Sequence, residues 1–201
     1  MSVSYASVVA EALTNATGPL PKRNWVSLNL LSPGYGSEEG RGEDCWVEDC
    51  EEIIEVYETS TTFRSLCGLT SHITELDLSG EASGGCPYRN LLPVDAMLLA
   101  AELKKGVTTG SLRTLRLDGN SLAGRDRDRQ IEPGHKEDDD EMEGIKALLE
   151  AVQVNTTLQC LFLKDNWLGP ESASALAAVV RHGTLRTLDL SGTPRLQIRP
   201  L

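Results

Sequence analysis

A six-residue spacing of leucines, L-x-x-L-x-L, recurs five times along this chain of 201 residues. The copies begin near residues 25, 73, 112, 158 and 185, with Trp25 and Ile73 in the first leucine place of the first two copies. The third and fourth copies extend into closely similar stretches, LRTLRLDGNSL at 112–122 and LQCLFLKDNWL at 158–168. An internal repeat at this scale is typical of modules that stack and share one core, so the pattern predicts a solenoid.

Each copy predicts a short strand in which the three leucines point into the core and the residues between them face outward. Asn120 and Asn166 follow two of these strands. A side-chain amide at that place can satisfy backbone groups of the turn that the strand ladder does not reach, so a structural role is predicted for both. Pro33, Glu81 and Thr193 hold this place in the other copies, where a less regular turn is expected.

Helical segments separate the predicted strands. The segment 170–183 has Pro170 and Glu171 in its first turn and ends at Gly183, which are ordinary start and stop signals of a helix. Further helices are predicted at 5–15, 50–66, 93–106 and 143–156. The expected order is one helix, then strand and helix four times, then a final strand, which is an α/β architecture.

The stretch LQCLFLKDNWLGPESASALAAVVRHGTLRTLDLSG at 158–192 resembles the leucine-rich repeat family. Within that family it is similar to the long, helix-containing subclass of ribonuclease inhibitor and of Nod-like receptor repeats. The resemblance implies a single leucine-rich-repeat domain over 1–201 with about five repeats. It also implies a horseshoe arc with parallel strands on the concave face and helices on the convex face. The family is chiefly a protein-binding scaffold, so the resemblance is specific for fold and general for function.

Three insertions interrupt the repeats at 32–49, 80–93 and 124–143, each between a strand and the helix after it. Stacking would therefore place all three on one rim of the array. The first insertion has six acids and one arginine, and the third has nine acids and four bases. The acidic block of the third includes Asp138, Asp139 and Asp140. It is interpreted either as a solvated loop or as a docking rim for a basic segment of a partner.

The outward places of the five predicted strands define a candidate binding face. Phe162 stands out there, because an aromatic side chain that faces solvent is costly without a partner or a covering loop. Arg116 and Asp189 are predicted to flank it, and the hypothesis is that Phe162 and Arg116 form a binding hot spot. The other candidate partner-binding residues on this face are Glu75, Asp77, Asp118 and Lys164.

Charge and cysteine content limit the classes of partner and the compartment. The formal net charge of −11 argues against binding to nucleic acid or to anionic membrane and favours a basic protein partner. The five cysteines form no C-x-x-C pair, and the N-terminal stretch has neither a basic start nor a long apolar run. These features predict a protein of a reducing compartment, cytoplasmic or nuclear, without a membrane span.

No pattern in the sequence indicates catalysis, a cofactor or a metal. Nucleophile-elbow, phosphate-loop and dinucleotide-binding motifs are absent. Asp126, Asp128 and Glu137 fit three places of a calcium loop, but Gln130 and Ile131 occupy its fifth and sixth places, and the sixth requires glycine. The histidines and cysteines also lack the paired spacing of a zinc site. A non-enzymatic protein is therefore expected, with no cofactor and no metal.

The functional prediction is an adaptor that binds a protein through its concave face and its acidic rim. One alternative is an activator of a small GTPase, because Ran GTPase-activating proteins use similar repeats, although no motif here matches their catalytic arginine. Another is the sensing fragment of a larger Nod-like or cytoskeletal protein. After the last strand the sequence reads SGTPRLQIRPL and provides no further helix, so self-association through this edge is also considered.

Overall fold

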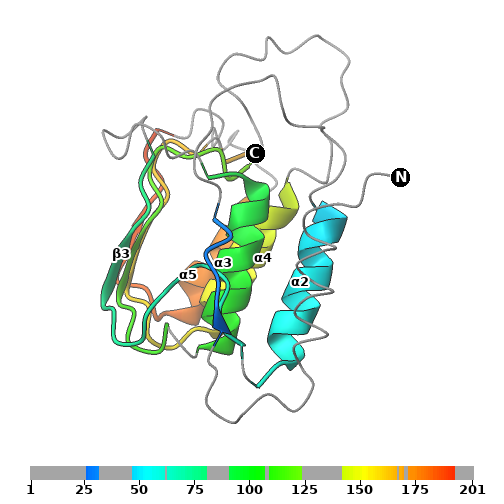
Figure 1. Ribbon diagram of the computed structural model, residues 1–201. Coiled ribbons are helices and arrows are strands. Elements are labelled where there is room, and N and C mark those ends of the chain that lie inside the picture. Colours follow the sequence, from blue (N-terminus) through cyan, green and yellow to red (C-terminus); the bar gives the residue numbers. More distant parts are fainter. Residues whose placement is uncertain are drawn as a thin grey trace, which may run out of the picture.

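The computed structural model describes residues 26–31, 47–61, 63–80, 91–106, 109–123, 142–166, 168–169 and 172–192. These residues form a mixed fold in which the strands of a parallel sheet make one layer and helices make a second layer beside it (Figure 1). The predicted helix at 5–15, the acidic block at 138–140 and the C-terminal residues 193–201 lie outside the described residues.

Four short strands form the main sheet in the order β3-β4-β5-β6. They are β3 Glu75–Asp77, β4 Thr114–Arg116, β5 Cys160–Phe162 and β6 Thr187–Asp189. All three pairings are parallel, and the middle residues Leu76, Leu115, Leu161 and Leu188 lie in one register row. The last four predicted strands therefore occur where the leucine spacing places them, and equivalent leucines stack on one another.

Four helices are described, and three of them cover one face of this sheet. Their bounds are α2 Val47–Thr59, α3 Pro93–Lys105, α4 Glu143–Val154 and α5 Ala173–His182. In Figure 1, α3, α4 and α5 lie beside the sheet, and α2 lies beside α3. Gly144 permits the close contact of α4 with the start of α3, because a side chain there would collide with the backbone of Pro93.

The core lies between the sheet and the helices, and its side chains are most completely buried in the two central repeats. There the repeat leucines are at most 1% exposed, whereas Leu76 and Leu188 on the outer strands are half-buried. The fully buried leucines of the six-residue pattern in these two repeats are Leu112, Leu115, Leu117, Leu158, Leu161 and Leu163. The difference follows from stacking, because an inner strand has a neighbour on both sides and an outer strand of this sheet has one.

Asn120 and Asn166 tie adjacent repeats together at the end of the strands, as a structural role requires. The Nδ2 atom of Asn120 donates to the carbonyl oxygens of Leu78 and Leu117 at 2.9 and 2.8 Å, and its Oδ1 atom accepts the N–H of Leu91 at 2.9 Å. Asn166 donates to the carbonyl oxygen of Leu117 at 2.7 Å. Both side chains are buried, and each spans from its own repeat to the preceding one.

The first repeat differs from the prediction. Its strand, β1 Val26–Ser27, pairs in parallel with β2 Phe63–Ser65 in a separate two-stranded sheet, not with β3. The helix predicted over 50–66 is also wrong in its bounds: α2 begins at Val47, inside the predicted first insertion, and ends at Thr59. Ser27, Asn29 and Leu31 therefore do not extend the outward rows of the main sheet.

Two side chains of α3 hold the chain that follows α2. The Nζ atom of Lys105 donates to the carbonyl oxygens of Tyr57, Ser60 and Phe63, so it caps the end of α2 and holds the following turn. The buried carboxylate of Glu102 accepts the backbone N–H groups of Leu66 and Cys67 at 2.8 and 3.2 Å. These contacts join positions more than 30 residues apart, which helical periodicity alone does not reveal.

The two outer strands carry a like charge at the same register position, and this predicts resistance to end-to-end stacking. If β3 of a second copy continued the ladder beyond β6 in register, its Asp77 would lie opposite Asp189, and like charges directly opposite are destabilising. Replacing both Asp77 and Asp189 with Asn should therefore raise self-association measured by sedimentation equilibrium. Replacing Glu143 and Glu150, which are exposed on α4, with Gln makes the same change in net charge. Equal self-association of the two double variants would contradict the prediction.

Candidate binding face on the parallel sheet

The outward residues of β3 to β6 form the candidate binding face, in three rows across the strands. Register pairing brings together most of the residues selected from the sequence, because equivalent places of successive repeats become neighbours. The first row is Glu75, Thr114, Cys160 and Thr187, and the second is Asp77, Arg116, Phe162 and Asp189. Ser79, Asp118, Lys164 and Ser191 follow two residues later in the chain.

Arg116 and Phe162 are in direct contact at the centre of this face. The guanidinium carbon of Arg116 lies 4.0 Å from the ring centroid of Phe162, which is a cation–π contact. The Nε atom of the same arginine donates to Oε1 of Glu75 at 3.3 Å. The side chains of Arg116 and Glu75 are 37% and 60% exposed, so their ion pair contributes little to stability. The same guanidinium thus contacts both the carboxylate of Glu75 and the ring of Phe162.

Phe162 is half-buried, and its neighbours define its surroundings. On the β4 side it is in contact with Arg116, and on the β6 side its register partner is Asp189. The hypothesis that Phe162 and Arg116 act together is therefore compatible with their positions. Their use in binding a partner stays a prediction.

Asp77 and Asp189 have a local structural contact that the sequence reasoning missed. Oδ1 of Asp77 accepts the N–H of Ser79 at 3.0 Å, and Oδ1 of Asp189 accepts the N–H of Ser191 at 2.9 Å. Each carboxylate thus stabilises the turn after its own strand. The signal was present in the sequence, because the same five residues, LDLSG, occur at 76–80 and at 188–192.

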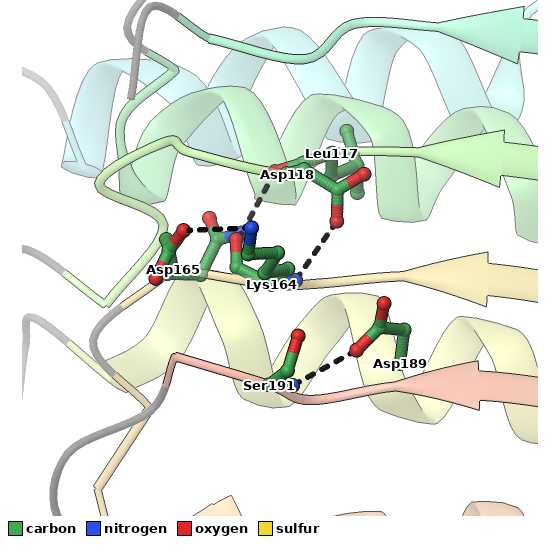
Figure 2. A network of polar contacts seen from close by, with 7 residues as sticks. Leu117, Asp118, Lys164, Asp165, Asp189 and Ser191 are labelled. Atoms are coloured by element: carbon green, nitrogen blue, oxygen red, sulfur yellow. Dashed lines mark hydrogen bonds and ion pairs between the residues drawn. The ribbon is translucent and has the colours of Figure 1, made fainter. Parts of the chain in front are cut away.

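Asp118 joins two repeats at the end of the strands. Its Oδ1 atom accepts the backbone N–H of Lys164 at 2.9 Å, and Figure 2 shows the carboxylate of Asp118 directed toward Lys164. The ammonium group of Lys164 lies 3.7 Å from Oδ2 of Asp165. Asp118 is only 8% exposed, whereas Lys164 is exposed, so the lysine is available to a partner and the aspartate is mainly a structural link.

Two carboxylates of this face, Asp118 and Asp189, have pKa values shifted in opposite directions. Burial raises the pKa of Asp118, and the nearby charges of Asp189 and Asp77 raise it further, against the opposing effects of the Lys164 N–H and of Arg116. Hydrogen bonds from Ser191 lower the pKa of Asp189 below its ordinary value. Asp189 is therefore ionised at neutral pH and presents a stable negative charge beside Phe162.

Asp138, Asp139 and Asp140 of the predicted rim lie outside the described residues. Within the described part of the chain, no group of three or more His, Cys, Asp or Glu side chains could hold a metal ion. None of the helices in the described ranges combines the length and the apolar character needed to cross a bilayer. The chemistry of the described face is that of a mixed-charge surface with one aromatic side chain.

Residues 154–177, which run from the end of α4 through β5 into α5, match the family described as Leucine Rich repeat. This match and the ladder of stacked leucines support a leucine-rich repeat protein with an α/β fold. Domains of this family generally mediate protein–protein interactions and are generally not enzymes.

The solved structures include a match to the C-terminal domain of tropomodulin from Caenorhabditis elegans. The sequence identity is 18% and the TM-score is 0.26, and the match covers 67% of this chain and 59% of that chain. The chain therefore spans less than two thirds of the length of the solved chain it matches. No curated protein sequence matches it.

Asp118→Asn and Asp189→Asn should change the free energy of unfolding in opposite directions near neutral pH. An amide oxygen can accept the same N–H at either position. Each variant therefore differs from the wild type mainly by the loss of one negative charge. A raised folded-state pKa contributes stability below the unfolded pKa and loses it as the pH rises through the folded value, so Asp118→Asn should stabilise. A lowered one contributes stability above the unfolded pKa and loses it as the pH falls through the folded value, so Asp189→Asn should destabilise.

Urea denaturation near neutral pH and at a pH below about 3, under the ordinary Asp value, measures both differences. Each difference should shrink at the lower pH, where both aspartates are protonated in the unfolded chain. Two variants that shift stability in the same direction at neutral pH would contradict the assignment.

Proposed function

We propose that this protein is an interaction scaffold that binds a partner protein through the outward face of β3 to β6. The proposal includes an arc-shaped array of the ribonuclease-inhibitor-like subclass, with this face on its concave side. It is supported by the general role of leucine-rich repeats and by the mixture of charged and aromatic side chains on the face. A reducing compartment, cytoplasmic or nuclear, is part of the proposal. It is supported by the free thiols of Cys67 and Cys160.

The observation that carries the proposal is the contact between Arg116 and Phe162. Arginine and aromatic residues are enriched where binding energy concentrates in protein interfaces, especially at the centre of the contact area. Here the pair lies on the two inner strands, β4 and β5, with acidic side chains on both outer strands. The face therefore has an apolar, cationic centre and an acidic border.

Phe162→Ala should weaken partner binding by about 2 kcal/mol or more while it changes the free energy of unfolding by less than about 1 kcal/mol. The physical reason is that a half-buried ring on the outward face contributes little to the core but supplies a large contact area to a partner. Affinity is measured by titration with the partner recovered from cell extract by the wild-type chain. Unfolding is measured in urea.

Val180→Ala is the matched control, because Val180 is an exposed apolar residue on α5, in the helix layer. It should leave the affinity unchanged. A loss of stability in Phe162→Ala equal to its loss of affinity would show that the ring belongs to the core and would remove it from the binding site.

The acidic block at 138–140 is proposed as a docking rim for a basic segment of the same partner. Replacing Asp138, Asp139 and Asp140 together with Asn should slow association and reduce its dependence on salt, because exposed charges act mainly on encounter. The melting temperature should change little. Association rates measured by stopped flow at low and high salt test this. Rates equal to those of the wild type under both conditions would remove the rim from the mechanism.

The identity of the recovered partner separates the proposed scaffold from its alternatives. A nucleotide-bound small GTPase whose hydrolysis accelerates on binding would favour a GTPase regulator. A larger polypeptide that contains this array as one of its parts would favour the sensing fragment of a Nod-like or cytoskeletal protein. A stable complex with a protein of neither kind is the result expected from the scaffold proposal.

A further inference from the structure

The two sides of the Phe162 ring have different neighbours. On the β4 side, the long side chain of Arg116 reaches the ring, with its guanidinium carbon 4.0 Å from the centroid. On the β6 side, the outward residues are Thr187, Asp189 and Ser191, all with short side chains. Asp189 is the register partner of Phe162, so its carboxylate is the charged group of β6 closest to the ring in the ladder.

Arg116 shows how a guanidinium fits on this surface. It donates from Nε to the carboxylate of Glu75 and stacks on Phe162 at the same time, so it bridges an acid and the ring. The β6 side offers the same two groups, a carboxylate and the ring, on adjacent strands. The hydrogen bonds from Ser191 lower the pKa of Asp189, and the charge of Lys164 adds to this effect. The ammonium group of Lys164 forms an ion pair with Asp165, at 3.7 Å.

We propose that an arginine of the partner protein docks between Phe162 and Asp189, with its guanidinium stacked on the ring and paired with the carboxylate. This inference rests on the proposed function and specifies the chemistry of the partner at that site. Oδ1 of Asp189 already accepts the N–H of Ser191, and the side chain of Ser191 also donates to this carboxylate. A carboxylate has about four lone-pair sites, so Asp189 can still accept from the incoming guanidinium.

Arginine fits this position better than lysine does. A planar guanidinium can stack on an aromatic face and donate to a carboxylate within one geometry, whereas an ammonium group is compact and more strongly hydrated. The overall charge of the face agrees with a basic partner. Its acids are Glu75, Asp77, Asp118 and Asp189, and its bases are Arg116 and Lys164.

The test uses two synthetic peptides of equal length, one alternating arginine with glycine and the other alternating lysine with glycine. Each is titrated against the full chain, and binding is followed by fluorescence anisotropy. The arginine peptide should bind more tightly than the lysine peptide. Asp189→Asn should weaken binding of the arginine peptide by about fivefold, the loss of roughly 1 kcal/mol.

Glu150→Gln controls for the net charge, since Glu150 is exposed on α4 in the helix layer. It should leave the affinity for the arginine peptide unchanged. Phe162→Leu keeps an apolar side chain but removes the aromatic face, so it should abolish the preference for arginine over lysine. Equal effects of Asp189→Asn and Glu150→Gln, or an arginine preference that survives in Phe162→Leu, would overturn the inference.

The outcome separates this inference from the proposed function. If Phe162→Ala weakens binding of the native partner but Asp189→Asn leaves the affinity for the arginine peptide unchanged, the scaffold proposal stands and the arginine site is rejected. If the arginine peptide behaves as expected but Phe162→Ala leaves the native complex intact, the arginine site exists and the proposed use of this face is rejected.

Discussion

The structure depends on the register of four parallel strands. Leu76, Leu115, Leu161 and Leu188 occupy one row, so every repeat presents the same side to the helices. A shift of one residue in any strand would turn its core leucines outward, because successive side chains of a strand point to opposite faces. The buried amide of Asn120 fixes this register at the strand ends through bonds to two repeats.

The register that buries the leucines also assembles the outward face. Asp77, Arg116, Phe162 and Asp189 are far apart in the sequence but adjacent in the sheet, because each follows the central leucine of its strand. Their roles are nevertheless unequal. The outer aspartates hold the turns of their own strands, whereas Arg116 and Phe162 contact each other across two strands. A face built from equivalent positions thus combines structural residues with candidates for binding.

The N-terminal part of the described chain follows a different constraint. Lys105 and Glu102 on one helix direct their charged groups at backbone atoms after α2; Glu102 is buried and Lys105 is half-buried. A buried carboxylate is costly unless it is hydrogen-bonded, and the N–H groups of Leu66 and Cys67 meet that requirement. In this part of the chain β2 pairs with β1 in a separate sheet, and β3 is the outer strand of the main sheet.

The sequence by itself determined the strand positions of the last four repeats, the side of each strand on which the leucines lie, and the structural role of Asn120. These features follow from local spacing, because the period of a strand fixes which side chains share a face. Only the tertiary structure decided that β1 pairs with β2, that Glu102 holds the chain after α2, and that Arg116 stacks on Phe162. Each of these depends on contacts between segments that are distant in the chain, and no periodic pattern within one segment specifies its partner in another.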